Sequence, residues 1–161
     1  FRSVSGLVKT AGPVAAIFAV DPDPSPVFVT VLFLSFFFWE IGGQNIPADW
    51  TDMDADRRLG AQTLPVYFGP GISTVLLLIC LAYSIIFTGI AFQFTQKGMM
   101  LMPGIAAMLA GCYFLFIPGF RLYKSRSRFH AMALFNKASY YPPVLLFIVL
   151  LTISIKAVSG V

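Results

Sequence analysis

Long apolar stretches alternate with short polar ones along the chain. Five stretches come close to the roughly 20 apolar residues that a helix needs to cross a bilayer: residues 3–20, 27–43, 72–94, 99–120 and 140–158. The first is the least regular, because it contains Lys9 and Pro13. Pro and Gly mark two tight breaks, DPDPSP at 21–26 and TQKG at 95–98, as expected of short loops. The pattern predicts an all-α fold: a polytopic transmembrane helical bundle with five spans, in one domain of residues 1–161.

The composition agrees with a chain that folds in lipid. Hydrophobic residues make up 58% of the sequence and charged residues 11%, with a mean hydropathy of +0.82, whereas soluble domains are about 25% charged. A core of this size has no room to bury so much Phe, Leu and Ile. We therefore expect the lipid bilayer to be a partner of this protein.

The basic residues predict how the spans are oriented. Five of them lie in residues 121–139, and Arg57 and Arg58 lie in residues 44–71, whereas the alternate breaks hold only Lys97. Two spans separate the two basic segments, which therefore belong on the same side of the membrane. Because cytoplasmic loops carry the excess of Lys and Arg, we expect both in the cytoplasm, with the N-terminus inside and the C-terminus outside.

The net charge of +4 and the pI of about 9.3 do not indicate nucleic-acid binding, because no basic face with stacking aromatics is present. Cys80 and Cys112 lie inside apolar stretches, which favours buried small side chains over a metal site or a disulfide. The single histidine, His130, lies among basic residues, and we interpret it as a loop residue without a catalytic role.

Aromatic residues make up 16% of the chain. They cluster in the second stretch and open the fifth: Phe33, Phe36, Phe37, Phe38, Trp39, Tyr140 and Tyr141. Contacts with lipid and interfacial belts account for most such rings. The alternative is that some of them form the wall of a pocket for an apolar or cationic ligand.

Four of the seven acidic residues fall within eight positions, in the segment NIPADWTDMDADRRLG at 45–60. Asn45, Asp49, Asp52 and Asp56 are spaced i, i+4, i+7 and i+11, so a continuous helix would hold them within roughly a 60° arc, with Asp54 pointing elsewhere. Carboxylates along one stripe repel one another. The arrangement therefore predicts a bound cation.

Oxygen-only ligands favour a hard ion such as Mg²⁺, whereas zinc sites generally use His and Cys. Pro47 should kink or restart the helix, which makes the place of Asn45 on the stripe less secure than that of the aspartates. Two other interpretations stay open. The acids could belong to a solvated loop beside Arg57 and Arg58, or serve ion transport, although transport carboxylates usually lie deep in a span.

The acidic segment resembles the second aspartate-rich motif of the UbiA family of intramembrane prenyltransferases. The resemblance rests on N-x3-D-x2-D-x-D-x-D-x3-G-x2-T-L-P-x3-G, running from Asn45 to Gly69 directly after a membrane-length stretch. FNKASYYPP at 135–143 is similar to the start of the family's last helix, and Phe1-Arg2 to the end of its basic loop before the fifth helix. The likeness spans the whole chain and is most specific in the aspartates.

The resemblance implies a nine-helix bundle around a central cavity, where two aspartate motifs hold Mg²⁺ ions that bind the diphosphate of an isoprenyl donor. Asp52 and Asp56 match the catalytic D-x3-D pair, and Asp49 matches a further acid found in some branches. All three are implied metal ligands. Asn45 and Arg2 match positions that the resemblance implies in diphosphate binding.

One departure from the family is large. Its first motif, N-D-x2-D-x3-D, and its first four helices are absent here, so the five stretches correspond to helices five to nine. The chain also starts at Phe1 without Met or a signal-peptide pattern. We therefore expect the C-terminal part of a longer enzyme, inactive without its missing N-terminal half.

The resemblance implies Mg²⁺-dependent transfer of an isoprenyl group from a prenyl diphosphate to a lipophilic or aromatic acceptor. A quinone precursor of the hydroxybenzoate or naphthoate type is the first expectation, with glycerol phosphate lipids and haem or chlorophyll precursors as alternatives. A CDP-alcohol phosphotransferase is a poorer match, because its D-G-x2-A-R motif does not occur in the sequence. Outside enzymes, the alternative is a non-catalytic helical membrane module or a transporter fragment.

Overall fold

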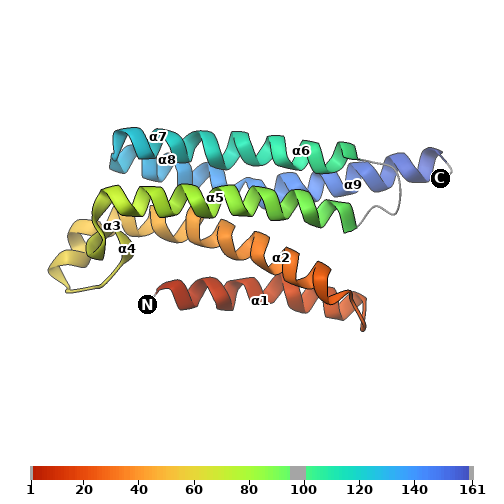
Figure 1. The fold of residues 1–161 in the computed structure, drawn as a ribbon, viewed down its shortest axis with the longest axis horizontal. Helices are drawn as coiled ribbons and strands as arrows, with labels where there is room; N and C mark the ends of the chain where they lie inside the picture. Colours follow the sequence, from red (N-terminus) through yellow and green to blue (C-terminus); the bar gives the residue numbers. More distant parts are fainter. Residues whose placement is uncertain (1, 95–100, 160–161) are drawn as a thin grey trace.

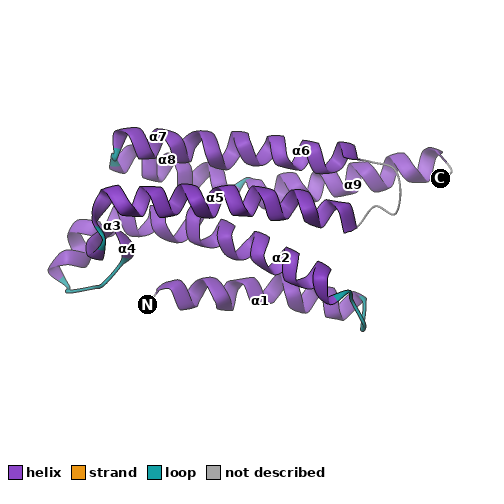
Figure 2. Cartoon of the chain, viewed as in Figure 1, coloured by secondary structure: helices purple, strands orange, loops and turns teal. Residues whose placement is uncertain are grey.

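The computed structural model describes residues 2–94 and 101–159, and the side chains of residues 6–94 and 101–158. All regular structure in these residues is helical, as Figure 2 shows, which confirms the predicted all-α fold. The long helices run side by side in a bundle (Figure 1): α1 (Arg2–Val20), α2 (Pro26–Trp39), α5 (Gly69–Phe94), α6 (Leu101–Gly111), α7 (Ile117–Ser125), α8 (Arg128–Ser139) and α9 (Tyr141–Ser159). The predicted break at 95–98, with Lys97, lies outside the described residues.

Four helical runs in the described residues are long and apolar enough to cross a membrane: Pro26–Arg58, Gly69–Phe94, Leu101–Ser125 and Arg128–Val158. They contain the described parts of the second to fifth predicted spans. The first predicted span forms α1, in which Gly6–Val20, the part with described side chains, is a shorter apolar helix outside those four. A crossing by α1 stays a prediction.

The structure corrects the two predicted polar loops, 44–71 and 121–139, because both are largely helical. The first contains α3 (Ile46–Arg58) and the short α4 (Leu64–Tyr67), and the second continues α7 and begins α8. Polar residues such as Arg, Lys and Glu form helices as well as most apolar ones do, so loss of hydrophobicity alone does not end a helix. His130 is therefore a helical residue in the first turn of α8, where Ser127 Oγ accepts its backbone N–H at 3.3 Å.

Two π-helical turns interrupt the α-helices, η1 (Glu40–Asn45) and η2 (Cys112–Phe116). Each is followed by an α-helix with Pro in its first turn, Pro47 and Pro118. Proline has no N–H to donate and its ring clashes with the carbonyl four residues earlier, and a wider turn relieves that clash. The predicted restart at Pro47 is thus a π-turn, and the helical run continues through it.

Helix α5 is central, since α2, α6, α7 and η1 all pack against it. Gly42 of η1 allows one close approach: a Cβ there would lie 2.9 Å from Cys80 Cβ and 3.1 Å from the carbonyl oxygen of Leu77. The buried core joins α3, α5, η2, α7, α8 and α9 through eleven side chains: Ile46, Trp50, Leu77, Leu81, Ile85, Leu115, Leu122, Ala131, Leu134, Ala138 and Tyr141.

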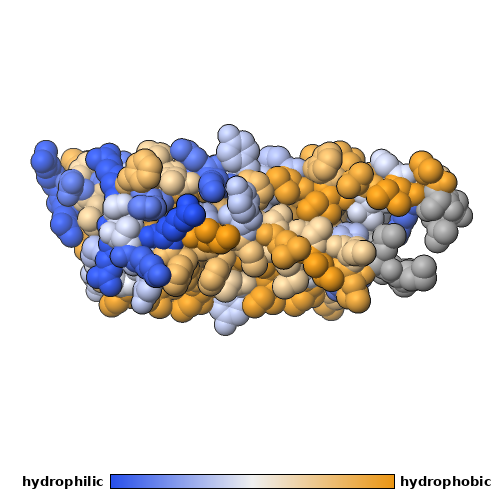
Figure 3. Space-filling model, turned by 90° about the horizontal axis from the view of Figure 1, so that it is seen from above, coloured by the Kyte–Doolittle hydropathy of each residue, from blue (hydrophilic) through white to orange (hydrophobic). Residues whose placement is uncertain are grey.

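The two ends of the bundle differ in polarity. Helix α3 and the α7–α8 turn lie at one end, with the N-terminus, whereas the α1–α2 turn and the C-terminus lie at the other (Figure 1). Hydrophilic side chains gather at the α3 end of the face in Figure 3, and hydrophobic ones cover much of the rest. The two basic segments therefore share one end, as predicted, and their cytoplasmic location stays a prediction.

Candidate functional site

Helix α3 is held by an apolar face that lies beside the predicted acidic stripe. Ile46 and Trp50, one turn apart, are 0% and 3% exposed and belong to the buried core. They lie roughly 100° around the helix from the predicted acidic stripe. Because the core fixes the rotation of α3, it also fixes the direction in which the acids point.

The structure places the three aspartates of the predicted stripe on α3, and Asn45 at the end of the π-turn η1 that precedes it. Asn45 has helical backbone angles, φ −67° and ψ −52°, and directly precedes α3, on which the three aspartates lie. Asn45, Asp49 and Asp56 are buried, with 8%, 3% and 8% of their surface exposed, whereas Asp52 is exposed. Asp54, which the spacing assigns to another face, is also exposed. The stripe therefore has buried members at both ends and a member open to solvent between them.

A glycine turn fixes the backbone beside Asp56. Gly60 has φ +67°, which glycine adopts without strain, and it ends α3. The Gly60 N–H donates to the Arg57 carbonyl at 3.3 Å and the Ala61 N–H to the Asp56 carbonyl at 2.9 Å. This pair of bonds is the Schellman motif that satisfies the last carbonyls of a helix. The turn thus holds the last acid of the stripe in a defined place.

The chemistry of this donor set fits Mg²⁺. Asp56 Oδ2 is buried and has no hydrogen-bond partner among the described residues, which is costly for a carboxylate oxygen unless a cation or donor satisfies it. Among the described residues, no group of three Asp, Glu, His or Cys side chains lies close enough together to hold a metal ion by itself. Mg²⁺ usually takes only one or two carboxylates and completes its shell with water and phosphate oxygens. One or two of these acids therefore suit a magnesium site that water and phosphate oxygens complete.

The N-terminal helix approaches this site through a glycine. A Cβ added to Gly6 would lie 3.5 Å from Asn45 Nδ2 and 3.7 Å from Glu40 Cγ, so α1 packs directly over these two residues. Arg2, predicted to bind diphosphate, is the first residue of α1, and its side chain lies outside the described residues.

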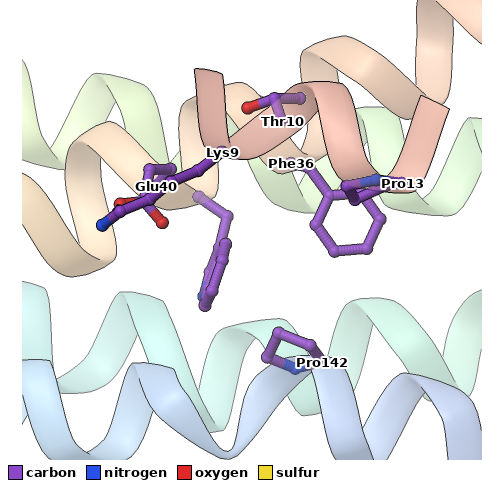
Figure 4. Close-up of a pocket in the computed structure, with 7 residues that line it drawn as sticks. Lys9, Thr10, Pro13, Phe36, Glu40 and Pro142 are labelled. Atoms are coloured by element: carbon purple, nitrogen blue, oxygen red, sulfur yellow. The ribbon is translucent and has the colours of Figure 1, made fainter. Parts of the chain in front are cut away.

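The sequence analysis missed a cavity between α1, α2 and α9. Its volume is about 150 Å³, and Figure 4 shows Lys9 and Glu40 beside each other at its edge. Lys9 Nζ donates to Glu40 Oε1 at 2.5 Å, and the Glu40 side chain is only 5% exposed. One sequence signal could have found it, since a glutamate inside an apolar membrane stretch is costly and marks a candidate functional site.

The predicted aromatic cluster of α2 divides between two environments. Phe36 and Trp39 line the cavity, together with Thr10, Pro13 and Pro142. On another side of the helix, Phe38 stacks on Tyr83 of α5 with ring centroids 5.2 Å apart. Some rings of this cluster therefore line a cavity and packing between helices accounts for others, while a ligand for that cavity stays a prediction.

Comparison with known proteins identifies the family of the chain. No curated protein and no solved structure matches the chain. The family model described as the UbiA prenyltransferase family matches residues 3–151, which include the acidic face of α3 and nearly all of the bundle. The chain belongs to the UbiA prenyltransferase family.

Proposed function

We propose that this protein, as part of a longer enzyme, transfers an isoprenyl group from a prenyl diphosphate to a lipophilic acceptor in a Mg²⁺-dependent reaction. A quinone precursor with an aromatic ring is the first candidate acceptor. Family membership supports the general activity. The observation that carries the rest is the acidic face of α3 at the polar end of an apolar bundle, with a buried Asp56 carboxylate oxygen that lacks a partner in the described residues.

In this proposal Asp49, Asp52 and Asp56 hold Mg²⁺, and Asn45 and Arg2 contribute to binding the diphosphate. The exposed position of Asp52 leaves it open to a ligand that arrives from water, whereas the burial of Asp49 and Asp56 keeps their carboxylates in a fixed orientation. When bound, Mg²⁺ supplies Lewis-acid neutralisation of the charge that develops on the diphosphate. The side-chain amide of Asn45 can donate a hydrogen bond to the diphosphate without adding negative charge to the site.

The reaction breaks the bond between the allylic carbon and the diphosphate oxygen, and the electron pair leaves with the diphosphate. The acceptor's electron pair then forms the new bond to that carbon, and the proton that the acceptor carbon or hydroxyl gives up passes to the released diphosphate. The allylic cation needs a site without water, and the apolar bundle supplies one. Phe36 and Trp39 line a cavity there, and each aromatic face stabilises a desolvated cation by about 1–2 kcal/mol.

The test compares three aspartate variants of the full-length enzyme. We expect Asp52→Asn and Asp56→Asn to lower the rate of prenyl transfer by at least about a hundredfold, because each removes a ligand that neutralises the leaving group. Asp54→Asn is the matched control: it makes the same chemical change two residues away on an exposed face. It should change the rate by less than about threefold, a barrier change below roughly 1 kcal/mol.

Transfer is measured with a radiolabelled prenyl diphosphate, with Mg²⁺ and with a chelator, and membrane insertion is checked by membrane fractionation. Wild-type turnover by Asp52→Asn or Asp56→Asn, or transfer that survives the chelator, rules out the proposed site. Equal losses in all three variants would show that general charge on α3, and no specific ligand, sets the rate.

A further inference from the structure

The Lys9–Glu40 pair joins an exposed ammonium to a buried carboxylate, and Glu40 lies one π-turn before Asn45 of the acidic stripe. Glu40 is 4% exposed, and its carboxylate is held by the ammonium of Lys9 on the neighbouring helix. Burying the Glu40 charge costs several kcal/mol before its attraction to Lys9, whose side chain is 60% exposed, compensates. An ion pair with a buried carboxylate, at the edge of a cavity, marks a candidate binding site.

The cavity has the size and walls for one planar ring. Its volume of about 150 Å³ is comparable to that of apolar cavities that bind benzene. Phe36 and Pro13 lie at one end of the opening, away from the ion pair, and Pro142 of α9 faces them across it (Figure 4). The indole of Trp39 is fixed by a 3.0 Å hydrogen bond from Nε1 to the carbonyl oxygen of Ala138. The cavity is therefore apolar at one end and ionic at the other.

The π-turn brings this cavity onto the side of the helix that carries the acids. In an α-helix, residues five apart point about 140° away from each other, whereas a turn closed by i→i+5 bonds returns them to nearly the same side. Glu40 and Asn45 are five apart across η1, and both lie against Gly6 of α1. Glu40 is about 13 Å along the axis from Asp49, at roughly 1.5 Å per residue. That length has room for a diphosphate group and one ring.

We propose that the cavity at Lys9 and Glu40 binds the hydroxyl group of a single-ring, phenol-type acceptor and selects against a carboxylate at the same position. That the ligand is the acceptor of the reaction rests on the proposed function. That the ligand is a phenol rests on the shape and charge of the cavity. A hydroxyl both donates and accepts, so its O–H can donate to the Glu40 carboxylate while its oxygen accepts from the Lys9 ammonium. A ligand carboxylate has no proton to donate and is repelled by Glu40, which already neutralises Lys9.

Binding of two matched probes to the full-length protein in nanodiscs, without prenyl donor, tests this. The probes are 4-ethylphenol and 4-ethylbenzoate, which differ only in the polar group. Quenching of Trp39 fluorescence reports occupancy. The chain has one other tryptophan, Trp50, which is buried in the core, and Trp39→Phe should remove the response.

We expect the wild-type protein to bind the phenol at least about tenfold more tightly than the benzoate, since a hydrogen bond to a charged group is worth a factor of this order. Glu40→Gln should reverse the order: Lys9 loses its counter-ion and pairs with the benzoate, and the phenol loses its charged acceptor. A reversal of preference cannot come from general damage to the fold. The double variant Lys9→Glu with Glu40→Lys restores both charges and should restore the phenol preference.

Thr10→Val is the control inside the cavity. The Thr10 hydroxyl donates to the carbonyl oxygen of Gly6 at 2.6 Å, so the ligand does not need it, and the preference should stay that of the wild type. The inference is overturned if neither probe quenches Trp39, if the wild type binds both equally, or if Glu40→Gln leaves the order unchanged. Prenyl transfer is measured separately. Transfer without a phenol preference rejects this site alone, and a phenol preference in a protein that transfers nothing rejects the proposed function alone.

Discussion

At the scale of single residues, the acids of α3 differ in environment although they share one spacing. Asp49 and Asp56 are buried and Asp52 is exposed. A buried carboxylate is costly unless it is paired or binds a cation, so Asp56, whose Oδ2 has no partner among the described residues, has the clearest need for a ligand. The exposed Asp52 is the one a diphosphate reaching the site from water can approach directly.

Gly60 shows how one backbone angle supports this site, and it yields a stability prediction. Gly60→Ala should lower the free energy of unfolding by about 1–2 kcal/mol, because an L side chain is strained at φ +67°. No atom lies within 4 Å of the added Cβ, so a steric clash is not the reason.

The matched control is Gly71→Ala in α5, which no proline follows and where the added Cβ meets only Arg126 side-chain atoms at 3.8 Å or more, an ordinary van der Waals contact. Its backbone is helical, so alanine should stabilise the protein by about 0.5–1 kcal/mol. Thermal unfolding in detergent measures both. If the two substitutions shift the melting temperature in the same direction, strain at Gly60 is not the cause.

At the scale of elements, the π-turn η1 sets how Glu40 is placed relative to the acids. Pro47→Ala restores a backbone N–H that can donate to Gly43, which allows the turn to tighten into an α-helix. Glu40 would then rotate away from the side that Asn45 and the aspartates share. We expect kcat for prenyl transfer to fall by at least about tenfold, a barrier increase of roughly 1.4 kcal/mol.

Pro118→Ala is the control for this prediction, because Pro118 is also buried and also follows a π-turn, on a helix without acids. It should change kcat by less than about threefold. Equal kcat values for the two variants would mean that the geometry of η1 has no part in the reaction.

At the scale of the whole molecule, the polar end holds the α3 acids and the basic α7–α8 segment together. This arrangement predicts the accessibility of cysteines introduced at the two ends, in a protein with Cys80→Ala and Cys112→Ala. Leu59, 82% exposed, lies at the polar end, and Ser25 lies in the turn at the opposite end. A membrane-impermeant maleimide added to intact cells should label Ser25→Cys, and should label Leu59→Cys only after permeabilisation. The opposite result would invert the predicted orientation, and labelling of both in intact cells would contradict the predicted spans.

The sequence by itself determined the helical membrane class and the acidic stripe, because both depend on local quantities. Length and hydropathy of a stretch decide whether it can cross a bilayer, and the spacing of Asn45, Asp49, Asp52 and Asp56 decides that a helix gathers them on one side. The sequence predicts loops at 44–71 and 121–139, and both predictions are wrong because they rest on hydropathy alone. Hydropathy records where a helix leaves the apolar layer, and it does not record where the helix ends.

Only the tertiary structure decided which acids are buried and where the cavity lies. Burial of Asp49 and Asp56 depends on the packing of the neighbouring helices and on the core contacts of Ile46 and Trp50, which fix the rotation of α3. The Lys9–Glu40 pair joins residues 31 positions apart on two helices. Contacts between distant residues follow from how helices pack and from the wide turn before Pro47, and no local pattern of residues encodes them.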